Sequence, residues 1–127
     1  YNGNLRTTCE HIKSGNTFIT DAPTDNNGKG EAFSPTDTVV TALASCMLTV
    51  MGIKADQLNV DMINATAEVV KTMASNPRRI SKIDMVIKLP KSYDEKTKSI
   101  LEHTANTCPV HFSLHPDIER LVQFNWG

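Results

Sequence analysis

The sequence predicts an α+β fold, in which antiparallel sheets are combined with two main helices, one of them long, central and buried. Three observations support this class. Helix-start signals occur at Ser34 and Ser92, short strand-like runs lie in pairs around turn residues, and the segments follow one another as strand pair, helix, strand pair, helix and strand. Such an order places helices on one face of an antiparallel sheet, and 127 residues suit a single domain over residues 1–127.

The first strand pair is predicted at residues 5–12 and 17–20. A cluster of turn-forming residues at 13–16 separates the two runs, which is typical of a hairpin. Residues 21–30 are rich in proline, asparagine and glycine, and we expect them to form a loop that is too polar for the core.

The central helix is the most informative segment. Ser34 suits its N-cap, Pro35 its first position and Asp37 its third, which makes a capping box with aspartate in place of glutamate. Residues 38–53 contain no charged side chain, and a helix that is apolar all round is expected to be buried on all sides. These 16 uncharged residues are few for a membrane span. Because so short a chain has little surface left to cover the helix, we predict a homodimer.

The second strand pair is predicted at residues 60–73 and 80–89. Both runs alternate between apolar and polar side chains, and Asn76-Pro77 marks the turn between them, so the pair should be antiparallel. Residues 120–126 have the composition of a last strand.

Two further helical segments are predicted after residue 90. Ser92 and Glu95 form an S-x-x-E capping signal, which opens a second helix up to about residue 106. Pro109 suits the first position of a short helical turn over residues 109–115.

Composition and charge exclude several classes of function. A net charge of −1 and a pI near 6.5 give no electrostatic reason to expect nucleic acid or an anionic membrane as a partner. Three cysteines at long spacings do not make a secreted disulfide framework, and no signal peptide is visible, so we expect a cytoplasmic protein. His111 and His115 could share a helical face, but no third ligand follows, and neither a metal nor another cofactor is expected.

Cys46 and Cys108 each allow two interpretations. Cys46 lies in the middle of the buried helix, where a free cysteine often acts as a small hydrophobic residue, and only context marks a reactive thiol. The predicted helical turn places Cys108 at an N-cap, where freed backbone N–H groups favour a thiolate, although a cysteine before proline can also be a cap alone. Cys9 lies on the first strand and has no assigned role.

Two sequence motifs resemble those of the osmotically inducible protein C family. Residues 33–37 read F-S-P-T-D and residues 42–46 read A-L-A-S-C, which is similar to the family's S-P-x-acid and A-L-G-S-C helix motif. The C-P-V at residues 108–110 is similar to its second motif, and the resemblance covers nearly the whole chain. It implies an intertwined homodimer with each site at the subunit interface, and a two-cysteine peroxidase cycle that needs no metal, flavin or haem.

The resemblance also implies a role for each residue. Cys46 attacks an organic hydroperoxide, or alternatively hydrogen peroxide, and becomes a sulfenic acid. Cys108 then closes a Cys46–Cys108 disulfide, which an external dithiol such as a dihydrolipoyl group reopens, in defence against oxidative stress. Arg6 lies on the first strand, where the family places its catalytic arginine, and can hold Cys46 as a thiolate.

The chain departs from the hydroperoxide-reducing branch at one position. That branch carries a glutamate that orients the arginine, whereas this chain has Thr36 there and Asp37 one place later. One residue rotates a helical side chain by about 100°, so Asp37 is a candidate for the role, and the match is closer to a less characterised branch. The alternatives are a non-catalytic member of the fold that binds a small apolar ligand or redox partner at the dimer cleft, and a purely structural interaction domain with inert cysteines.

Overall fold

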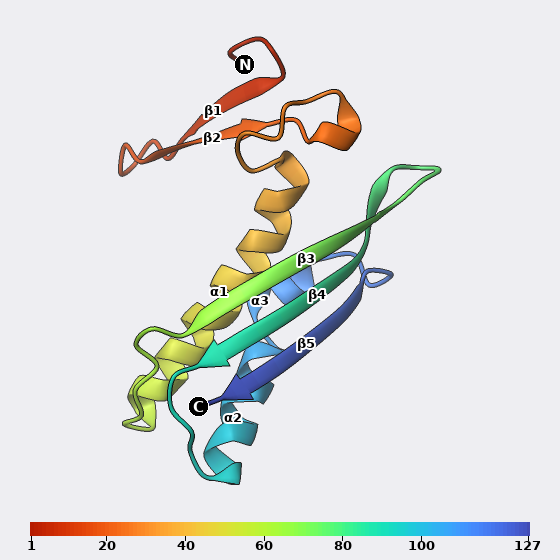
Figure 1. Cartoon of the computed structure of the whole chain (residues 1–127). Coiled ribbons are helices and arrows are strands. Elements are labelled where there is room, and N and C mark those ends of the chain that lie inside the picture. The colour runs from red at the N-terminus through yellow and green to blue at the C-terminus, as the bar shows by residue number, and fades with distance from the viewer. The chain divides into compact units, whose positions relative to one another are not determined.

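The computed structural model describes all residues, 1–127, and the chain divides into two compact units, residues 1–39 and residues 40–127. We describe each unit by itself. The order of elements is strand pair, helix, strand pair, two helices and strand, which confirms the predicted α+β class (Figure 1).

The N-terminal unit is built on the predicted hairpin. Strands β1 (Arg6–Glu10) and β2 (Thr17–Asp21) are antiparallel, and their register places Arg6 opposite Asp21. The following loop contains one turn of 3₁₀ helix, η1 (Thr24–Asn26). Asp21, which we expected in an exposed loop, is the last residue of β2 and only 1% exposed. The prediction was wrong here because the Asp21 carboxylate has partners inside the unit, which are described with the candidate site.

The predicted capping box opens helix α1 (Pro35–Gln57). The Asp37 N–H donates to Ser34 Oγ at 3.0 Å, and the Ser34 N–H donates to Asp37 Oδ2 at 2.9 Å. Both donors at the start of the helix are therefore satisfied reciprocally, which confirms the helix start derived from the sequence.

The C-terminal unit contains a three-stranded sheet in the order β3 (Thr66–Ala74), β4 (Arg79–Leu89) and β5 (Glu119–Trp126). β3 and β4 are antiparallel as predicted, although β3 begins at Thr66 rather than at residue 60. β5 pairs with β4 in parallel, so the sheet is mixed. The chain crosses over between β4 and β5 through two helices, and such a crossover is what a parallel pair requires.

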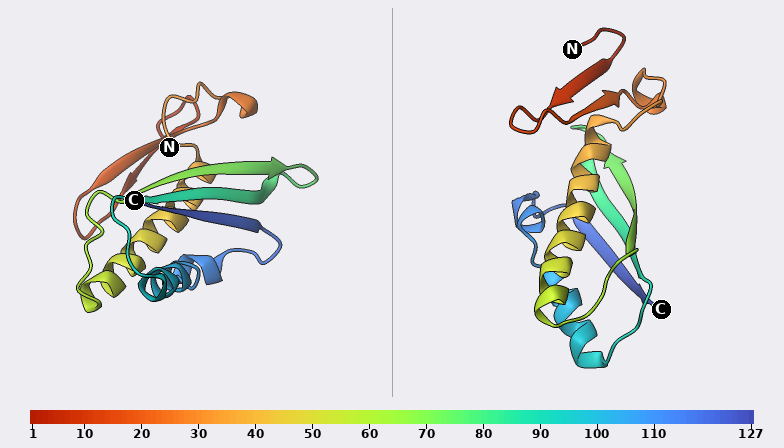
Figure 2. Two further views of the ribbon diagram at one scale, coloured as in Figure 1. Left: turned by 60° about the horizontal axis from the view of Figure 1, so that its bottom comes forward. Right: turned by 90° about the vertical axis from the view of Figure 1, so that its left-hand side faces the viewer.

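All the helical segments of this unit cover the same face of the sheet (Figures 1 and 2). Alternate residues of β4 point into the core, as the period of two requires. α1 contributes one buried face at helical spacing, and Leu101 contributes from the next helix. The buried core residues are Val40, Leu43, Ala44, Met47, Met51, Ala55, Ile83, Met85, Ile87, Leu89, Leu101, Ala105 and Cys108.

Within one chain, α1 is buried along one face and not on all sides as we expected. Its opposite face carries the outer stripe, which we define as Ala42, Cys46, Thr49 and Ile53, and Ile53 is 57% exposed. By length and apolarity alone α1 could cross a membrane, but core helices of soluble proteins pass the same test. The packing of its inner face against β4 accounts for most of its apolar composition.

The last two helices are α2 (Glu95–Ala105) and α3 (Pro109–Ser113). The N-cap of α2 lies two residues later than the cap we predicted at Ser92, because Asp94 is the N-cap and its Oδ1 accepts from the Thr97 N–H at 2.8 Å. α3 begins at Pro109 with Cys108 as its N-cap, as predicted, and ends at Ser113 rather than at residue 115.

We predict that Asp94→Ala lowers the melting temperature by about 3–6 °C at neutral pH, whereas Ser92→Ala leaves it unchanged. The hydrogen bond from the Thr97 backbone lowers the pKa of Asp94, so the carboxylate stabilises α2 above its unfolded pKa. The difference between wild type and Asp94→Ala should therefore shrink as the pH falls through the lowered folded pKa. Thermal unfolding followed by circular dichroism at several pH values measures this, and an equal loss in Ser92→Ala would contradict the assignment of the cap.

Candidate active site

Cys46 lies on α1 at the edge of the buried face. Its side chain is half-buried and packs against the core, and it belongs to the outer stripe. The helical repeat accounts for this place, because Cys46 precedes the buried Met47 by one residue and so points about 100° away from it.

Cys108 lies at the start of α3 and is 0% exposed. Its Sγ accepts a hydrogen bond from the His111 N–H at 3.3 Å, so the sulfur takes the place of the usual oxygen at an N-cap. Pro109 occupies the first position of α3, so the segment between α2 and α3 ends at Cys108.

The fold brings these two thiols together. The Cys46 side chain lies beside the Cys108 thiol, close enough to act on it through a hydrogen bond and through its charge. Both residues are free cysteines, and no disulfide joins them. Two thiols that are distant in the sequence are therefore neighbours between α1 and the start of α3.

Burial raises the pKa of the Cys108 thiol, and the neighbouring Cys46 raises it further by its hydrogen bond and its charge. The backbone N–H groups of His111 and Val110 act in the opposite direction but do not reverse the shift. Cys108 is therefore held as a neutral thiol at neutral pH.

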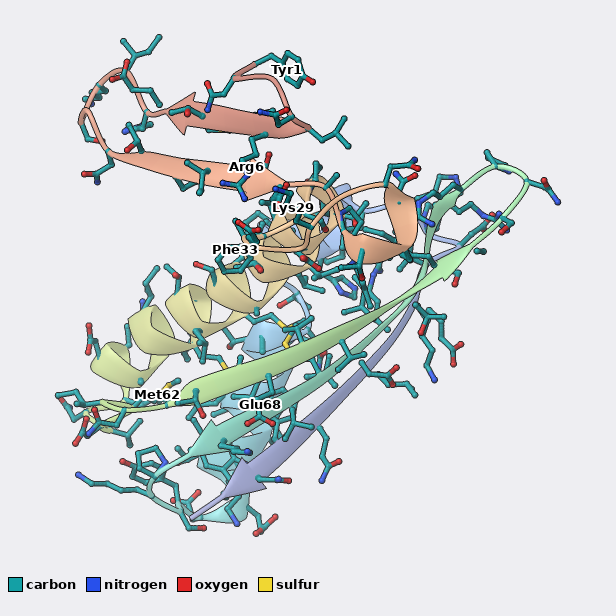
Figure 3. The ribbon with its side chains drawn as sticks, turned by 45° about the horizontal axis from the view of Figure 1, so that its top comes forward. Tyr1, Arg6, Lys29, Phe33, Met62 and Glu68 are labelled. Atoms are coloured by element: carbon teal, nitrogen blue, oxygen red, sulfur yellow. The ribbon has the colours of Figure 1, made fainter.

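Arg6 belongs to the N-terminal unit, where two carboxylates surround it. Its Nη2 donates to Glu31 Oε2 and lies 3.6 Å from Oδ2 of the buried Asp21, whose carboxylate also accepts from the Glu31 N–H at 2.9 Å. Figure 3 shows Arg6 beside the segment that carries Lys29 and Phe33. Glu31, followed by Asp21, raises the pKa of Arg6, so this guanidinium is charged at every physiological pH.

Neither of these two carboxylates was predicted from the sequence as a partner of Arg6. Only part of the signal for Asp21 was present in the sequence, because the predicted turn at residues 13–16 would place Asp21 opposite Thr8. In the observed register Glu10 lies opposite Thr17, and Asp21 therefore lies opposite Arg6. Glu31 had no comparable signal, since its place depends on the path of the loop after β2. Asp37, our candidate for an acidic partner, uses its carboxylate in the cap of α1.

A separate groove of about 590 Å³ lies between α1 and the segment before β3. Neither thiol lines this groove, so it is not the thiol site. Figure 3 labels Met62, which is one of its lining residues. No group of three or more histidine, cysteine or acidic side chains is arranged to hold a metal ion.

The sequence model of the OsmC family, described as OsmC-like protein, matches residues 28–120. The chain belongs to this family. The match includes both thiols and Glu31, and it begins after Arg6. This OsmC-like protein has no match among the curated proteins with which it was compared.

Solved structures with the same fold include a protein from Psychrobacter arcticus, provisionally described as an osmotic stress induced and detoxification response protein. It is 53% identical, covers 98% of this chain and 90% of its own, and superposes with a TM-score of 0.95. An organic hydroperoxide resistance protein OsmC from Legionella pneumophila shares 9% identity over 95% of each chain, with a TM-score of 0.69. Another such resistance protein, from Elizabethkingia anophelis, shares 10% identity over 96% of this chain and 94% of its own, with a TM-score of 0.75. At these low identities, the last two show the fold alone.

We predict that Cys46→Ser lowers the pKa of Cys108, because it removes the neighbouring charge that opposes ionisation. In a Cys9→Ser background, where Cys9 contributes no signal, thiolate absorbance measured against pH should show the Cys108 transition at lower pH once Cys46 is replaced. An unchanged transition would contradict the contact between the two thiols.

Proposed function

We propose that this OsmC-like protein is a thiol-dependent peroxidase that reduces organic hydroperoxides, with hydrogen peroxide as an alternative substrate. One observation carries the proposal: two free thiols, Cys46 and Cys108, lie side by side at the edge of the core. Membership of the OsmC-like family and the fold shared with two organic hydroperoxide resistance proteins support it.

The difference in burial assigns the two roles. Cys46 is partly exposed and can meet a peroxide, whereas Cys108 is fully buried. In the first step the Cys46 thiolate attacks one peroxide oxygen, an S–O bond forms and the O–O bond breaks. The alcohol leaves after taking up a proton, and Cys46 becomes a sulfenic acid.

Cys108 then resolves the sulfenic acid. Its sulfur attacks the Cys46 sulfur, an S–S bond forms, and the S–O bond breaks to release water. An external dithiol, for which we propose a dihydrolipoyl group, reduces the disulfide by exchange and restores both thiols. A cytoplasmic location belongs to this proposal, because that compartment keeps thiols reduced between turnovers.

Arg6 is the cation that we propose for the peroxide step. The family resemblance implies this role for an arginine of the first strand, and the two carboxylates around Arg6 support it. Glu31 accepts a hydrogen bond from the guanidinium and Asp21 forms an ion pair with it, which restrains its orientation as a positioned cation requires.

The outer stripe supports a homodimer in which a second copy completes the site. Ala42 and Ile53 are exposed apolar residues on either side of Cys46 along this stripe. A helix face of this composition is stabilised when another apolar surface covers it. We therefore propose that the candidate thiol Cys46 lies at the subunit interface of this dimer.

The decisive experiment treats reduced protein with one equivalent of cumene hydroperoxide and follows the products by mass spectrometry. We expect the wild type and the Cys9→Ser control to form an intramolecular Cys46–Cys108 disulfide, and Cys108→Ser to stop at a sulfenic acid on Cys46. Cys46→Ser should consume no peroxide. Persistence of both thiols in the wild type would remove the peroxidase proposal and leave the binding or purely structural alternatives.

A matched set of variants separates Glu31 from Asp37 as the acidic partner of Arg6. We expect Arg6→Gln to slow sulfenic acid formation on the order of 10²-fold. Glu31→Gln should slow it by about tenfold, because it removes a hydrogen bond to a charged group. Asp37→Asn should leave this rate unchanged and alter only the stability of α1. A slow Asp37→Asn together with a normal Glu31→Gln would return the role to Asp37, our original candidate.

A further inference from the structure

The groove between α1 and the segment before β3 takes no part in the proposed peroxidase cycle. Its volume of about 590 Å³ lies within the range of small-molecule sites, which is about 300–1,000 Å³. One wall is a face of α1, on which Leu48, Gly52, Ala55 and Asp56 follow one another at helical spacing. The other wall consists of residues 60–65, and both walls belong to the C-terminal unit.

Hydrogen bonds hold the second wall in place. The Tyr93 hydroxyl accepts from the Asp61 N–H at 2.9 Å and donates to the Asp61 carbonyl oxygen at 2.8 Å. Asp61 Oδ1 accepts from the Ile63 N–H at 2.8 Å, and the Ala65 N–H donates to the Met62 carbonyl oxygen at 2.9 Å. The groove is therefore preformed, and a ligand does not have to order this wall when it binds.

Most of the lining is apolar, and part of it is exposed to solvent. Leu48 and Ala55 of α1 face Val60 and Met62 across the groove, and Ile63 is 73% exposed. The unbranched side chain of methionine adapts to groups of different shape. An apolar body of a ligand would therefore remove this surface from water.

Two residues of the α1 wall are unfavourable for a helix at the positions they occupy. Gly52 lies inside α1, where glycine is less stable than alanine, although a Cβ here would meet no atom within 4 Å. Asp56 lies in the last turn, where the partial negative charge of the helix end opposes a carboxylate. Both line the groove one turn apart, and packing within the chain accounts for neither. A ligand that needs room at Gly52 and a negative charge at Asp56 accounts for both.

The uncompensated charge of the groove is negative. Lys91 Nζ lies 2.6 Å from Asp61 Oδ2 and compensates that carboxylate. Asp56 forms no ion pair, and Lys54 in the same turn of α1 does not line the groove. The Asp56 carboxylate and the carbonyl end of α1 therefore act together at this end of the groove, and both favour a cation.

We propose that this groove binds a small organic cation that carries an ammonium group on an aliphatic body. The ammonium group pairs with the Asp56 carboxylate through a charge-assisted hydrogen bond, and the aliphatic body fills the space at Gly52 against Met62 and Ile63. This inference is independent of the proposed peroxidase function, because neither thiol lines the groove.

The probe that tests the proposal is octylammonium, with 1-octanol and octanoate as the neutral and anionic probes of the same chain length. Each is titrated into protein that carries ¹³C-labelled methionine and isoleucine methyl groups. We expect octylammonium to shift the Met62 and Ile63 signals in a saturable way and to bind about fivefold more tightly than 1-octanol. Octanoate should bind more weakly than either, and added salt should reduce these differences.

Two variants test the two unusual residues of α1. Asp56→Asn should lower the affinity for octylammonium by about fivefold and leave the affinity for 1-octanol unchanged. Asp117→Asn, which changes an exposed aspartate before β5, is the matched control and should bind as wild type. Gly52→Leu fills the groove and should abolish binding of all three probes. Leucine is a better helix former than glycine, so the melting temperature of this variant should not fall.

Three outcomes would overturn the proposal. Equal affinity for the three probes, or normal binding of octylammonium by Asp56→Asn, would remove the cationic class of ligand. Unchanged Met62 and Ile63 signals at the highest octylammonium concentration would remove the site itself. If no probe shifts these signals and Gly52→Leu weakens the homodimer in sedimentation experiments, the groove is covered by a second copy of the chain. None of these outcomes bears on disulfide formation between Cys46 and Cys108, which is measured separately.

Discussion

The need to bury α1 is the constraint on which the rest of the C-terminal unit depends. Residues 38–53 carry no charge, and burial of each large side chain such as Leu43, Met47 or Met51 stabilises the fold by about 1.5–3 kcal/mol. β4 supplies the matching surface, since its alternate residues form a continuous apolar row. Once the inner face of α1 is packed against β4, the helical repeat fixes the direction of every other side chain on α1. This includes Cys46, which lies at the edge of the buried face.

The same packing places Cys108 in the core beside α1. α2 ends with the buried Ala105, and the chain restarts as α3 at Pro109, so the residue before the proline has to sit against the core. Cysteine is not among the residues preferred at an N-cap, because sulfur is a weaker acceptor than a hydroxyl or carboxylate oxygen. A serine would cap α3 better. The choice of a weaker cap at this position favours a chemical role for the sulfur over a purely structural one.

Local sequence patterns predicted most of the secondary structure. They were ambiguous or gave no signal where contacts between distant segments determine the structure. The hairpin, the capping box at Ser34 and the cap at Cys108 follow from patterns a few residues long. The start of α2 was misplaced because Ser92 and Asp94 are both good caps and only the helix path selects one. The parallel direction of β5 depends on the crossover from β4, so it has no local signature in the sequence.

The contact between the thiols also explains why the buried one would act second in the proposed cycle. Two unit charges about 4 Å apart repel by about 4 kcal/mol near a protein surface, so the pair carries one negative charge at most at neutral pH. Burial keeps a negative charge off Cys108 in particular, because it raises the pKa of this thiol. In the proposed cycle, oxidation of the Cys46 thiolate to a sulfenic acid removes its negative charge, which is one of the three causes that raise the pKa of Cys108. The first chemical step would thereby favour ionisation of Cys108 for the second step, while burial continues to oppose it.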